Sequence, residues 1–209
     1  MEAWQSGLMQ HPAKMLYLKG YRRFESSRLR NFKNTTMDLK LFYFFNNLAG
    51  QSRVFDVITV FFAEYSQYFL VALFLLLLYF SGYTKPEKLR VFWVTITSII
   101  ISRYVVTELI RFFYHRPRPF AAYQVRQLLS DGNWSFPSGH SAFFFALAAA
   151  IYLYNKKWGT GFFIAAILIS ASRVIAGVHY PSDILGGMFV GMFSAYIVFY
   201  LAEKKFGKI

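Results

Sequence analysis

Three clusters of arginine, histidine, serine and aspartate along the chain are of the kinds and spacing that could do chemistry. They are Arg111-x6-Arg118-Pro119, Pro137-Ser138-Gly139-His140 and Ser172-Arg173-x5-His179-x3-Asp183. Taken alone, each has an ordinary structural explanation, because arginines at span ends reach toward headgroups and a Pro-Ser-Gly turn often caps a helix. Taken together, they supply three arginines, two histidines and one aspartate.

This combined set of side chains predicts phosphoryl transfer. Arginine forks match phosphate oxygens, and the backbone N–H groups of residues 138–140 at a helix start offer an anion site that Gly139 lets a ligand approach closely. The carboxylate of Asp183 can fix the tautomer of His179 and stabilise the cation that develops there. One histidine is then a nucleophile and the other a general acid, which predicts a phosphohistidine intermediate.

The composition excludes several other chemistries. The chain has 209 residues and no Cys, so disulfides, thiolate metal sites and a cysteine nucleophile are impossible. No carboxylate cluster indicates a metal, and we expect neither a metal nor another cofactor. Hydrophobic residues make up 56% and charged residues 16%, which is too apolar for a soluble enzyme and predicts an integral membrane protein. The net charge of +13 comes from bases between apolar runs, which favours a membrane topology signal over nucleic-acid binding.

Five apolar stretches predict an all-α integral membrane bundle with five transmembrane helices. The third is short, but the turn at residues 137–140 could lengthen it. The two-residue alternation of a membrane barrel is missing from the sequence. The stretches run approximately over Asp56–Phe80, Val91–Phe113, Ser141–Tyr154, Gly161–Gly177 and Ile184–Ala202.

Basic residues in the loops predict the orientation of this bundle. Lysines and arginines lie at residues 85–90, 156–157 and 204–208, which five spans place on one side. The positive-inside rule makes that side cytoplasmic. All three clusters then lie on the opposite, external or periplasmic face.

The N-terminal part fits this topology poorly. Residues 1–36 contain seven Lys or Arg and two Glu, although five spans place them outside. They are either a basic, disordered arm or an extension ahead of a true start at Met37, so we divide the chain into residues 1–36 and a membrane-embedded domain, 37–209. Asp38–Gly50 is apolar and too short to cross, which predicts an interfacial helix or, alternatively, part of a sixth membrane-embedded helix.

The three clusters resemble the signature motifs of the type 2 phosphatidic acid phosphatase family, the lipid phosphate phosphatases. The family pattern is Lys-x6-Arg-Pro, Pro-Ser-Gly-His and Ser-Arg-x5-His-x3-Asp, in that order. The second and third motifs match at every fixed position, and Arg111 replaces the lysine of the first. The charge is kept, so we expect the phosphate contact to persist with altered geometry.

The resemblance implies a role for each matching residue. It implies that His179 attacks phosphorus, that Asp183 orients it, and that His140 protonates the leaving oxygen and then activates water. It also implies that the chemistry needs no metal, and that five residues bind the phosphate and stabilise its equatorial oxygens: Arg111, Arg118, Ser138, Gly139 and Arg173.

Within the family, the chain is similar to the bacterial undecaprenyl-diphosphate phosphatases. Softer matches at Phe55-Asp56, Ala63-Glu64-Tyr65 and residues 114–120 support this branch. The resemblance implies hydrolysis of a polyprenyl diphosphate to the monophosphate, which would recycle a lipid carrier for cell-wall synthesis. The partners implied are this lipid and the bilayer. His115 and Arg116 are candidates for contacts to the second phosphate or to lipid headgroups.

Three charged residues inside the spans have open roles, because such residues are costly in hydrocarbon unless paired or facing a cavity. Glu108 could support Arg111 through an i, i+3 contact and is a further candidate near the second phosphate. Arg103 and Glu108 lie about 140° apart on an α-helix, so we expect Arg103 to pair with Glu64 or solvent. A purely structural ion pair between spans is an equal alternative.

Other functions remain as alternatives. The substrate could be phosphatidylglycerophosphate, phosphatidic acid or a lipid A phosphate. A vanadate-dependent haloperoxidase shares the pocket, although five spans argue against it. A non-enzymatic lipid carrier with a vestigial anion site would not need a nucleophile, an acid and an orienting carboxylate together.

Overall fold

The computed structural model describes residues 36–207, and every regular element among them is helical, as predicted. The expectations for residues 1–35 lie outside this part of the chain. Two of the helices contain π-helical segments, named η3 and η4. The elements are α2 (Met37–Asn46), α3 (Arg53–Val60), η3 (Phe61–Tyr65), α4 (Ser66–Phe80), α5 (Lys85–Ile99), η4 (Ile100–Val106), α6 (Thr107–Phe113), α7 (Pro119–Ala122), α8 (Gly139–Tyr154), α9 (Lys156–Ile175) and α10 (Pro181–Phe206).

Four helices of the described part are long and apolar enough to cross a membrane. The α3–η3–α4 and α5–η4–α6 runs are continuous helices over Arg53–Phe80 and Lys85–Phe113, and α9 and α10 are the other two. They correspond to the first, second, fourth and fifth predicted spans, although α9 ends at Ile175, two residues before the predicted end. The third predicted span corresponds to α8, a shorter apolar helix that begins at Gly139.

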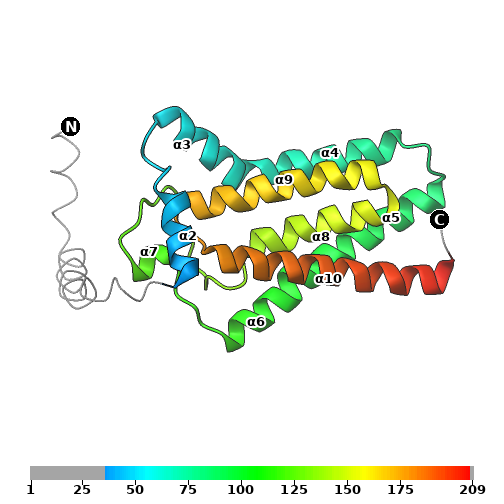
Figure 1. Cartoon of the computed structure of the whole chain (residues 1–209). Coiled ribbons are helices and arrows are strands. Elements are labelled where there is room, and N and C mark those ends of the chain that lie inside the picture. The colour runs from blue at the N-terminus through cyan, green and yellow to red at the C-terminus, as the bar shows by residue number, and fades with distance from the viewer. Residues whose placement is uncertain (1–35, 208–209) are drawn as a thin grey trace. The chain divides into compact units, whose positions relative to one another are not determined.

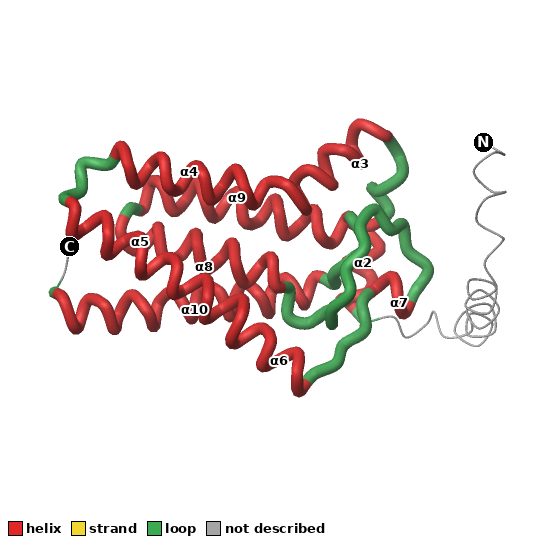
Figure 2. Tube along the Cα trace, turned by 180° about the vertical axis from the view of Figure 1, so that it is seen from behind, coloured by secondary structure: helices red, strands yellow, loops and turns green. Residues whose placement is uncertain are grey.

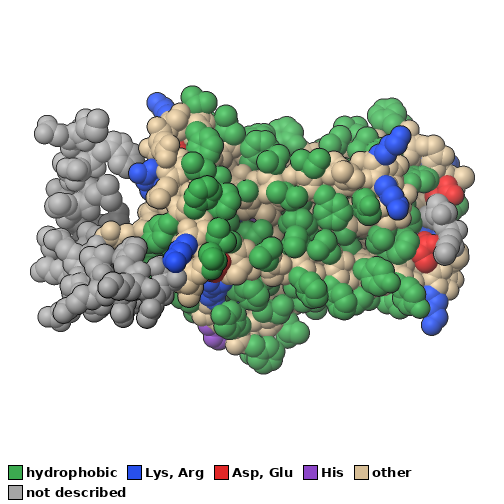
Figure 3. Space-filling model, in the orientation of Figure 1, with side chains coloured by type: hydrophobic (Ala, Val, Ile, Leu, Met, Phe, Trp, Pro, Cys, Tyr) green, Lys and Arg blue, Asp and Glu red, His purple; other side chains and the backbone are tan. Residues whose placement is uncertain are grey.

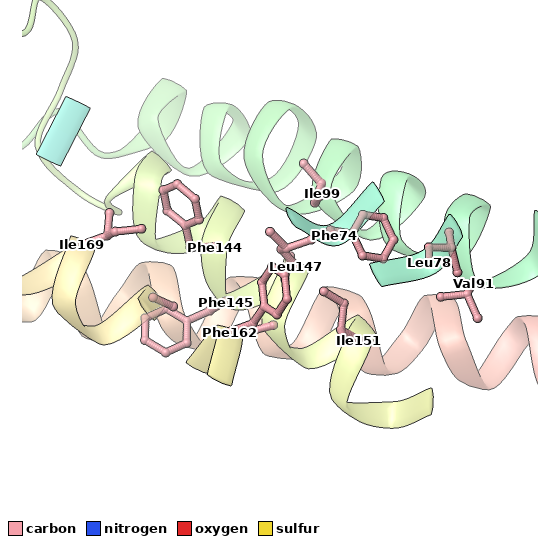
Figure 4. Packing of buried hydrophobic residues seen from close by; sticks show 13 residues of the cluster. Phe74, Leu78, Val91, Ile99, Phe144, Phe145, Leu147, Ile151, Phe162 and Ile169 are labelled. Atoms are coloured by element: carbon pink, nitrogen blue, oxygen red, sulfur yellow. The ribbon is translucent and has the colours of Figure 1, made fainter. Parts of the chain in front are cut away.

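Helix α8 lies at the centre of the bundle and packs against α5, α9 and α10 (Figure 1). Its side chains Phe144, Leu147 and Ile151 are buried in one cluster with Phe74 of α4 and Phe162 of α9 (Figure 4). A helix that is apolar all round is typical of such an inner position. The central helix therefore holds the second motif, at its start, within reach of its neighbours.

A close approach of two backbones brings the second and third motifs together. A Cβ atom added to Gly187 of α10 would lie only 2.4 Å from the carbonyl oxygen of Ser138. Small residues let helices in membranes pack at short range. The Ser138 backbone N–H also donates to the carbonyl of Asp183 at 3.0 Å, so the start of α8 is fixed against the start of α10.

Hydrophobic side chains cover the length of the helices on the face shown in Figure 3, and Lys and Arg side chains lie near both ends. Many of the exposed side chains on α4, α6 and α10 are aromatic or aliphatic. Such a surface is unfavourable in water and suited to lipid.

One end of the bundle carries α2, α7 and the long connection between α6 and α8 (Figure 2). Asn46 attaches α2 to this end, because its side-chain amide donates to the carbonyls of Arg126 (2.8 Å) and Ile175 (2.9 Å). Phe42 of α2 is fully buried in a cluster with Val174 and Tyr180. The helix expected within residues 38–50 is thus present as α2, and its position at a membrane interface stays a prediction.

Candidate active site

All three motifs meet at the end of the bundle that α2 covers. The first motif runs from Arg111 on α6 into the connection before α8, the second begins α8, and the third joins α9 to α10. Arg111 Nη2 donates to the carbonyl of Pro137 at 3.0 Å, and Arg118 Nη1 donates to the carbonyl of Val178 at 2.9 Å. These bonds link the first motif directly to the other two.

His179 lies at the centre of this arrangement and is 1% exposed. Its Nδ1 is 3.4 Å from Asp183 Oδ2, and its Nε2 is 3.1 Å from Arg118 Nη1. A guanidinium can only donate hydrogen bonds, so Nε2 must accept and the proton of the neutral ring lies on Nδ1, facing the carboxylate. The lone pair of Nε2 therefore points into the arginine cluster.

The protonation state of His179 suits a nucleophile. Burial is the main cause that lowers the pKa of its imidazole to about 4; the charge of Arg118 acts in the same direction and Asp183 opposes both. The ring is thus neutral near pH 7, and its Nε2 can attack an electrophile.

Asp183 is fully buried and held from several sides. Its Oδ2 accepts from the Tyr180 backbone N–H at 2.8 Å and from the Ser135 hydroxyl, and its Oδ1 is 2.7 Å from Arg116 Nη1. It sits in the first turn of α10, where a carboxylate is favoured by the helix dipole. These contacts leave Asp183 little freedom, so the position of His179 is set by the start of α10.

Arg111, Arg118 and Arg173 are all less than 5% exposed. Arg111 Nε and Arg173 Nε are buried and have no hydrogen-bond partner among the described residues. Buried donors without partners are costly, and oxygens of a bound phosphate would satisfy them. Burial lowers the pKa of Arg118 to about 10, which still leaves its guanidinium charged at neutral pH.

The start of α8 has the geometry of an anion site. Ser138 is the N-cap residue, and its hydroxyl accepts from the Ser141 N–H at 3.4 Å. The first N–H groups of a helix have no partner within the helix. A Cβ on Gly139 would come within 2.6 Å of Arg103 Nε, so a larger residue here would push this guanidinium from its position. His140 follows at the same turn.

The predicted pairing of Arg103 is wrong. It pairs with Glu108 and not with Glu64 or solvent. The reason is η4, the π-helical segment at Ile100–Val106, in which the turn per residue is smaller than in an α-helix, so residues five apart come onto one side. The expected support of Arg111 by Glu108 is present, with Arg111 Nη1 3.1 Å from Glu108 Oε1. Glu64 instead lies 3.5 Å from Arg173 Nη1.

The structure gives Arg116 a place behind the site. Its Nη1 pairs with Asp183, its Nη2 pairs with Asp38 at 2.7 Å, and its guanidinium lies 4.0 Å from the centre of the Tyr180 ring. These contacts give Arg116 a structural role, and its predicted contact to a second phosphate or a headgroup stays a prediction. The ring of His115 packs on Trp134 with centroids 4.7 Å apart, and its predicted role stays a prediction.

Three further side chains of this site were not predicted from the sequence. Asp131, in the connection before α8, bridges Arg118 and Arg173. Ser135 contacts Asp183, and Asp38 of α2 contacts Arg116. None belongs to a motif, and the signal that could have found Asp131 is the need of a buried arginine cluster for a counter-charge.

A metal centre has no ready ligand set in this part of the chain. No group of three or more His, Cys, Asp or Glu side chains among the described residues could hold an ion. The metal-free reaction remains a prediction that activity measurements must test.

Comparison with known proteins places this site in a family. The pattern that defines the PAP2 superfamily matches residues 87–206, the stretch that holds all three motifs. The chain belongs to the PAP2 superfamily. The family recognised from the motifs is thereby confirmed.

Curated relatives agree with this family assignment. Undecaprenyl-diphosphatase BcrC of Bacillus subtilis is 33% identical over 80% of this chain and 85% of its own length. The bacitracin transport permease protein BcrC of Bacillus licheniformis is 31% identical over 80% and 82%.

Among solved structures, LpxE of Aquifex aeolicus matches 81% of this chain and 98% of its own, with 29% identity and a TM-score of 0.66. A transmembrane PAP2 phosphatase of Bacillus subtilis shares the fold, with a TM-score of 0.56 at 20% identity over 90% of this chain and 94% of its own. The apolar helices and these PAP2 relatives make the chain a multi-pass membrane protein and a lipid phosphatase.

Proposed function

We propose that this PAP2 phosphatase hydrolyses a polyprenyl diphosphate, undecaprenyl diphosphate in particular, to the monophosphate through a phosphohistidine at His179. The observation that carries the proposal is the geometry of His179, whose Nδ1 faces Asp183 and whose Nε2 faces Arg118 at 3.1 Å. The substrate class is supported by the similarity to BcrC of Bacillus subtilis over most of both chains.

In the first step, the lone pair of His179 Nε2 attacks the terminal phosphorus. A P–N bond forms while the bond from phosphorus to the bridging oxygen breaks, and His140 gives a proton to the departing lipid monophosphate. The positive charge that develops on His179 is stabilised by Asp183. Arg111, Arg118 and Arg173 stabilise the charge on the equatorial oxygens.

In the second step, His140 takes a proton from water, and the resulting oxygen attacks the phosphorus of the phosphohistidine. The P–N bond breaks, inorganic phosphate leaves, and His179 returns to its neutral form. Ser138 and Gly139 bind the phosphate in both steps through the start of α8. We propose no metal in either step.

The proposed topology has five spans, which are the four long helices and the shorter α8, the third span along the chain. Residues 37–209 form the proposed phosphatase domain. Lys85, Lys88, Lys156, Lys157 and Lys204 lie at helix ends opposite the site, which supports a cytoplasmic position for that end. The active site then faces the external or periplasmic side, where diphosphate hydrolysis would return the carrier lipid for cell-wall synthesis. In bacteria, such an activity would lower sensitivity to bacitracin.

A second candidate substrate is a lipid A phosphate. The lipid A 1-phosphatase of Rhizobium etli supports it, with 44% identity over 29% of this chain and 26% of its own length, as does the lipid A 4'-phosphatase of Bacteroides thetaiotaomicron, 36% identical over 35% of this chain and 33% of its own length. Both matches cover only part of either protein, so the diphosphate is the stronger proposal.

A substrate comparison with purified protein in detergent tests the proposal. We expect undecaprenyl diphosphate to give a higher kcat/KM than phosphatidylglycerophosphate, phosphatidic acid or lipid A, with activity retained in EDTA. A clear preference for one of the other lipids would reject the diphosphate assignment, and loss of activity in EDTA would reject the metal-free mechanism.

A further inference from the structure

Asp131 occupies a position that the proposed mechanism gives to a phosphate. Its Oδ2 lies 2.8 Å from Arg118 Nη2 and 3.0 Å from Arg173 Nη2. A single carboxylate oxygen therefore bridges two of the three arginines that would bind the transferred phosphoryl group. Both arginines are buried, whereas the Asp131 side chain is 25% exposed.

The surroundings of Asp131 allow it to leave without unfolding the site. It lies in the connection between α7 and α8, beside Gly132, and not in a helix. Arg118 is anchored separately, because its Nε donates to the carbonyl of Asn133 at 2.6 Å and its Nη1 to that of Val178. Arg173 likewise keeps its contact to the carbonyl of Ala63 at 3.2 Å. Moving the Asp131 side chain alone would free Arg173 Nη2 and end the charge contact at Arg118 Nη2, a buried nitrogen that has no hydrogen-bond partner among the described residues.

The charges also favour an exchange. Burial would raise the pKa of the Asp131 carboxyl, but Arg118 and Arg173 hold it below its usual value, so the group is ionised at neutral pH. A carboxylate brings one negative charge to the buried arginines. A phosphomonoester or the end of a diphosphate brings close to two, with three terminal oxygens, and a phosphodiester brings only one.

We propose that Asp131 is a specificity-determining residue that competes with the substrate phosphate for Arg118 and Arg173, and thereby excludes phosphodiester headgroups. This inference rests on the proposed phosphatase function for its biological meaning. Terminal phosphates displace the carboxylate because they carry more charge. The phosphodiesters of ordinary phospholipids match its charge and gain little by replacing it.

Binding of inorganic orthophosphate to the purified full-length protein tests the competition without requiring turnover. In the bridged form Asp131 contacts both arginines, and in the open form it contacts neither. If the bridged form is about tenfold more populated, the apparent affinity for phosphate is about tenfold lower than that of the open form, and removing the carboxylate restores the higher affinity. We therefore expect Asp131→Asn to bind orthophosphate about tenfold more tightly by calorimetry. Asp131→Glu, which keeps the charge, should remain close to the unchanged protein.

A matched control is Asp56→Asn. The Asp56 carboxylate lies in the first turn of α3 and accepts from the Gly50 N–H, and among the described residues it pairs with no arginine of the site. It should leave orthophosphate affinity unchanged. The second arm uses dimethyl phosphate, a soluble phosphodiester, which should bind Asp131→Asn measurably and the unchanged protein far more weakly.

The outcomes separate the two proposals. Tighter phosphate binding by Asp131→Asn supports the competition even if no lipid diphosphate is hydrolysed, in which case only the proposed function fails. Equal or weaker phosphate binding would show that Asp131 merely orients the arginines, and would overturn the inference. If Asp131→Asn does not fold, Asp131→Ser provides the same readout with a smaller polar side chain.

Discussion

Two buried acid–arginine clusters lie within one bundle end and differ in how they are held. The Asp183 cluster consists of Asp183, Arg116 and Asp38, and the Asp131 cluster consists of Asp131, Arg118 and Arg173. Asp183 begins a long helix and is fully buried, whereas Asp131 lies in a connection and is a quarter exposed. The same type of ion pair can therefore serve as a fixed scaffold in one place and as an exchangeable counter-charge in another.

The two clusters meet at His179, which separates them. Asp183 contacts the Nδ1 side of the ring and Arg118 the Nε2 side. The Asp183 cluster thus determines which nitrogen of His179 is free to react, and the Asp131 cluster determines which phosphate that nitrogen can attack. Predictions for substitutions in each cluster differ accordingly.

The largest effect is expected for Asp183→Asn. It removes the charge that stabilises the cation on His179 and can force the other tautomer, so kcat should fall about 10⁴-fold, as for the equivalent change in a catalytic triad. Steady-state hydrolysis of the lipid diphosphate measures this. A loss of less than about tenfold would place Asp183 outside the reaction and make the Asp183 cluster purely structural.

Arg116→Gln should act on the scaffold through stability. It leaves Asp183 and Asp38 without their shared counter-charge, and breaking a buried ion pair typically costs about 3–5 kcal/mol. We expect a lower thermal inactivation midpoint in detergent together with reduced kcat and little change in KM. A change confined to KM for the diphosphate would instead support contact between Arg116 and the substrate.

Arg111→Lys should reduce kcat/KM by a smaller factor, and it tests whether the arginine fork is needed in the phosphate pocket. Arg111 uses two nitrogens at once, one toward Glu108 and one toward the carbonyl of Pro137, and a lysine ammonium cannot reproduce this fork. Since the charge is kept, we expect kcat/KM to fall only about threefold to tenfold. An unchanged kcat/KM would show that the family lysine and this arginine are equivalent here.

The smallest effect concerns pH. An imidazole with the ordinary pKa of about 6.5 would be almost fully protonated at pH 5, but His179 titrates near 4 and stays mostly neutral. With a phosphate ester that has a good leaving group, the acid limb of kcat/KM should therefore lie near pH 4. An acid limb near 6.5 would show that His179 is more solvated than its burial indicates.

The same shift has a consequence for stability with a defined sign. Between pH 6.5 and about 4, the unfolded chain binds a proton at His179 that the folded chain does not. Stability from this group is therefore complete above pH 6.5 and is lost as the pH falls toward 4. In His179→Gln, the midpoint of thermal inactivation should lack the part of the pH dependence that comes from this titration. The comparison is a control that separates loss of stability at low pH from the acid limb of the activity profile.

The three motifs and the apolar runs were sufficient to predict the long helices and the motif residues that meet at the site. The turn at residues 137–140, which we expected to lengthen the third span, agrees with the observed start of α8 at Gly139 behind the Ser138 cap. Local spacing failed at Arg103, because the π-helical turn that redirects it has no clear mark in the sequence. It also failed at Asp38 and Asp131, whose roles depend on contacts with residues far along the chain.

The central claim is that His179 becomes phosphorylated. The most direct measurement is rapid alkaline quenching of the enzyme during turnover, with the phosphate position read by mass spectrometry. We expect a phosphohistidine at residue 179, formed in the unchanged protein and in His140→Ala with a good leaving group, and missing in His179→Ala. A phosphate on His140, or a phosphohistidine that persists in His179→Ala, would contradict the account.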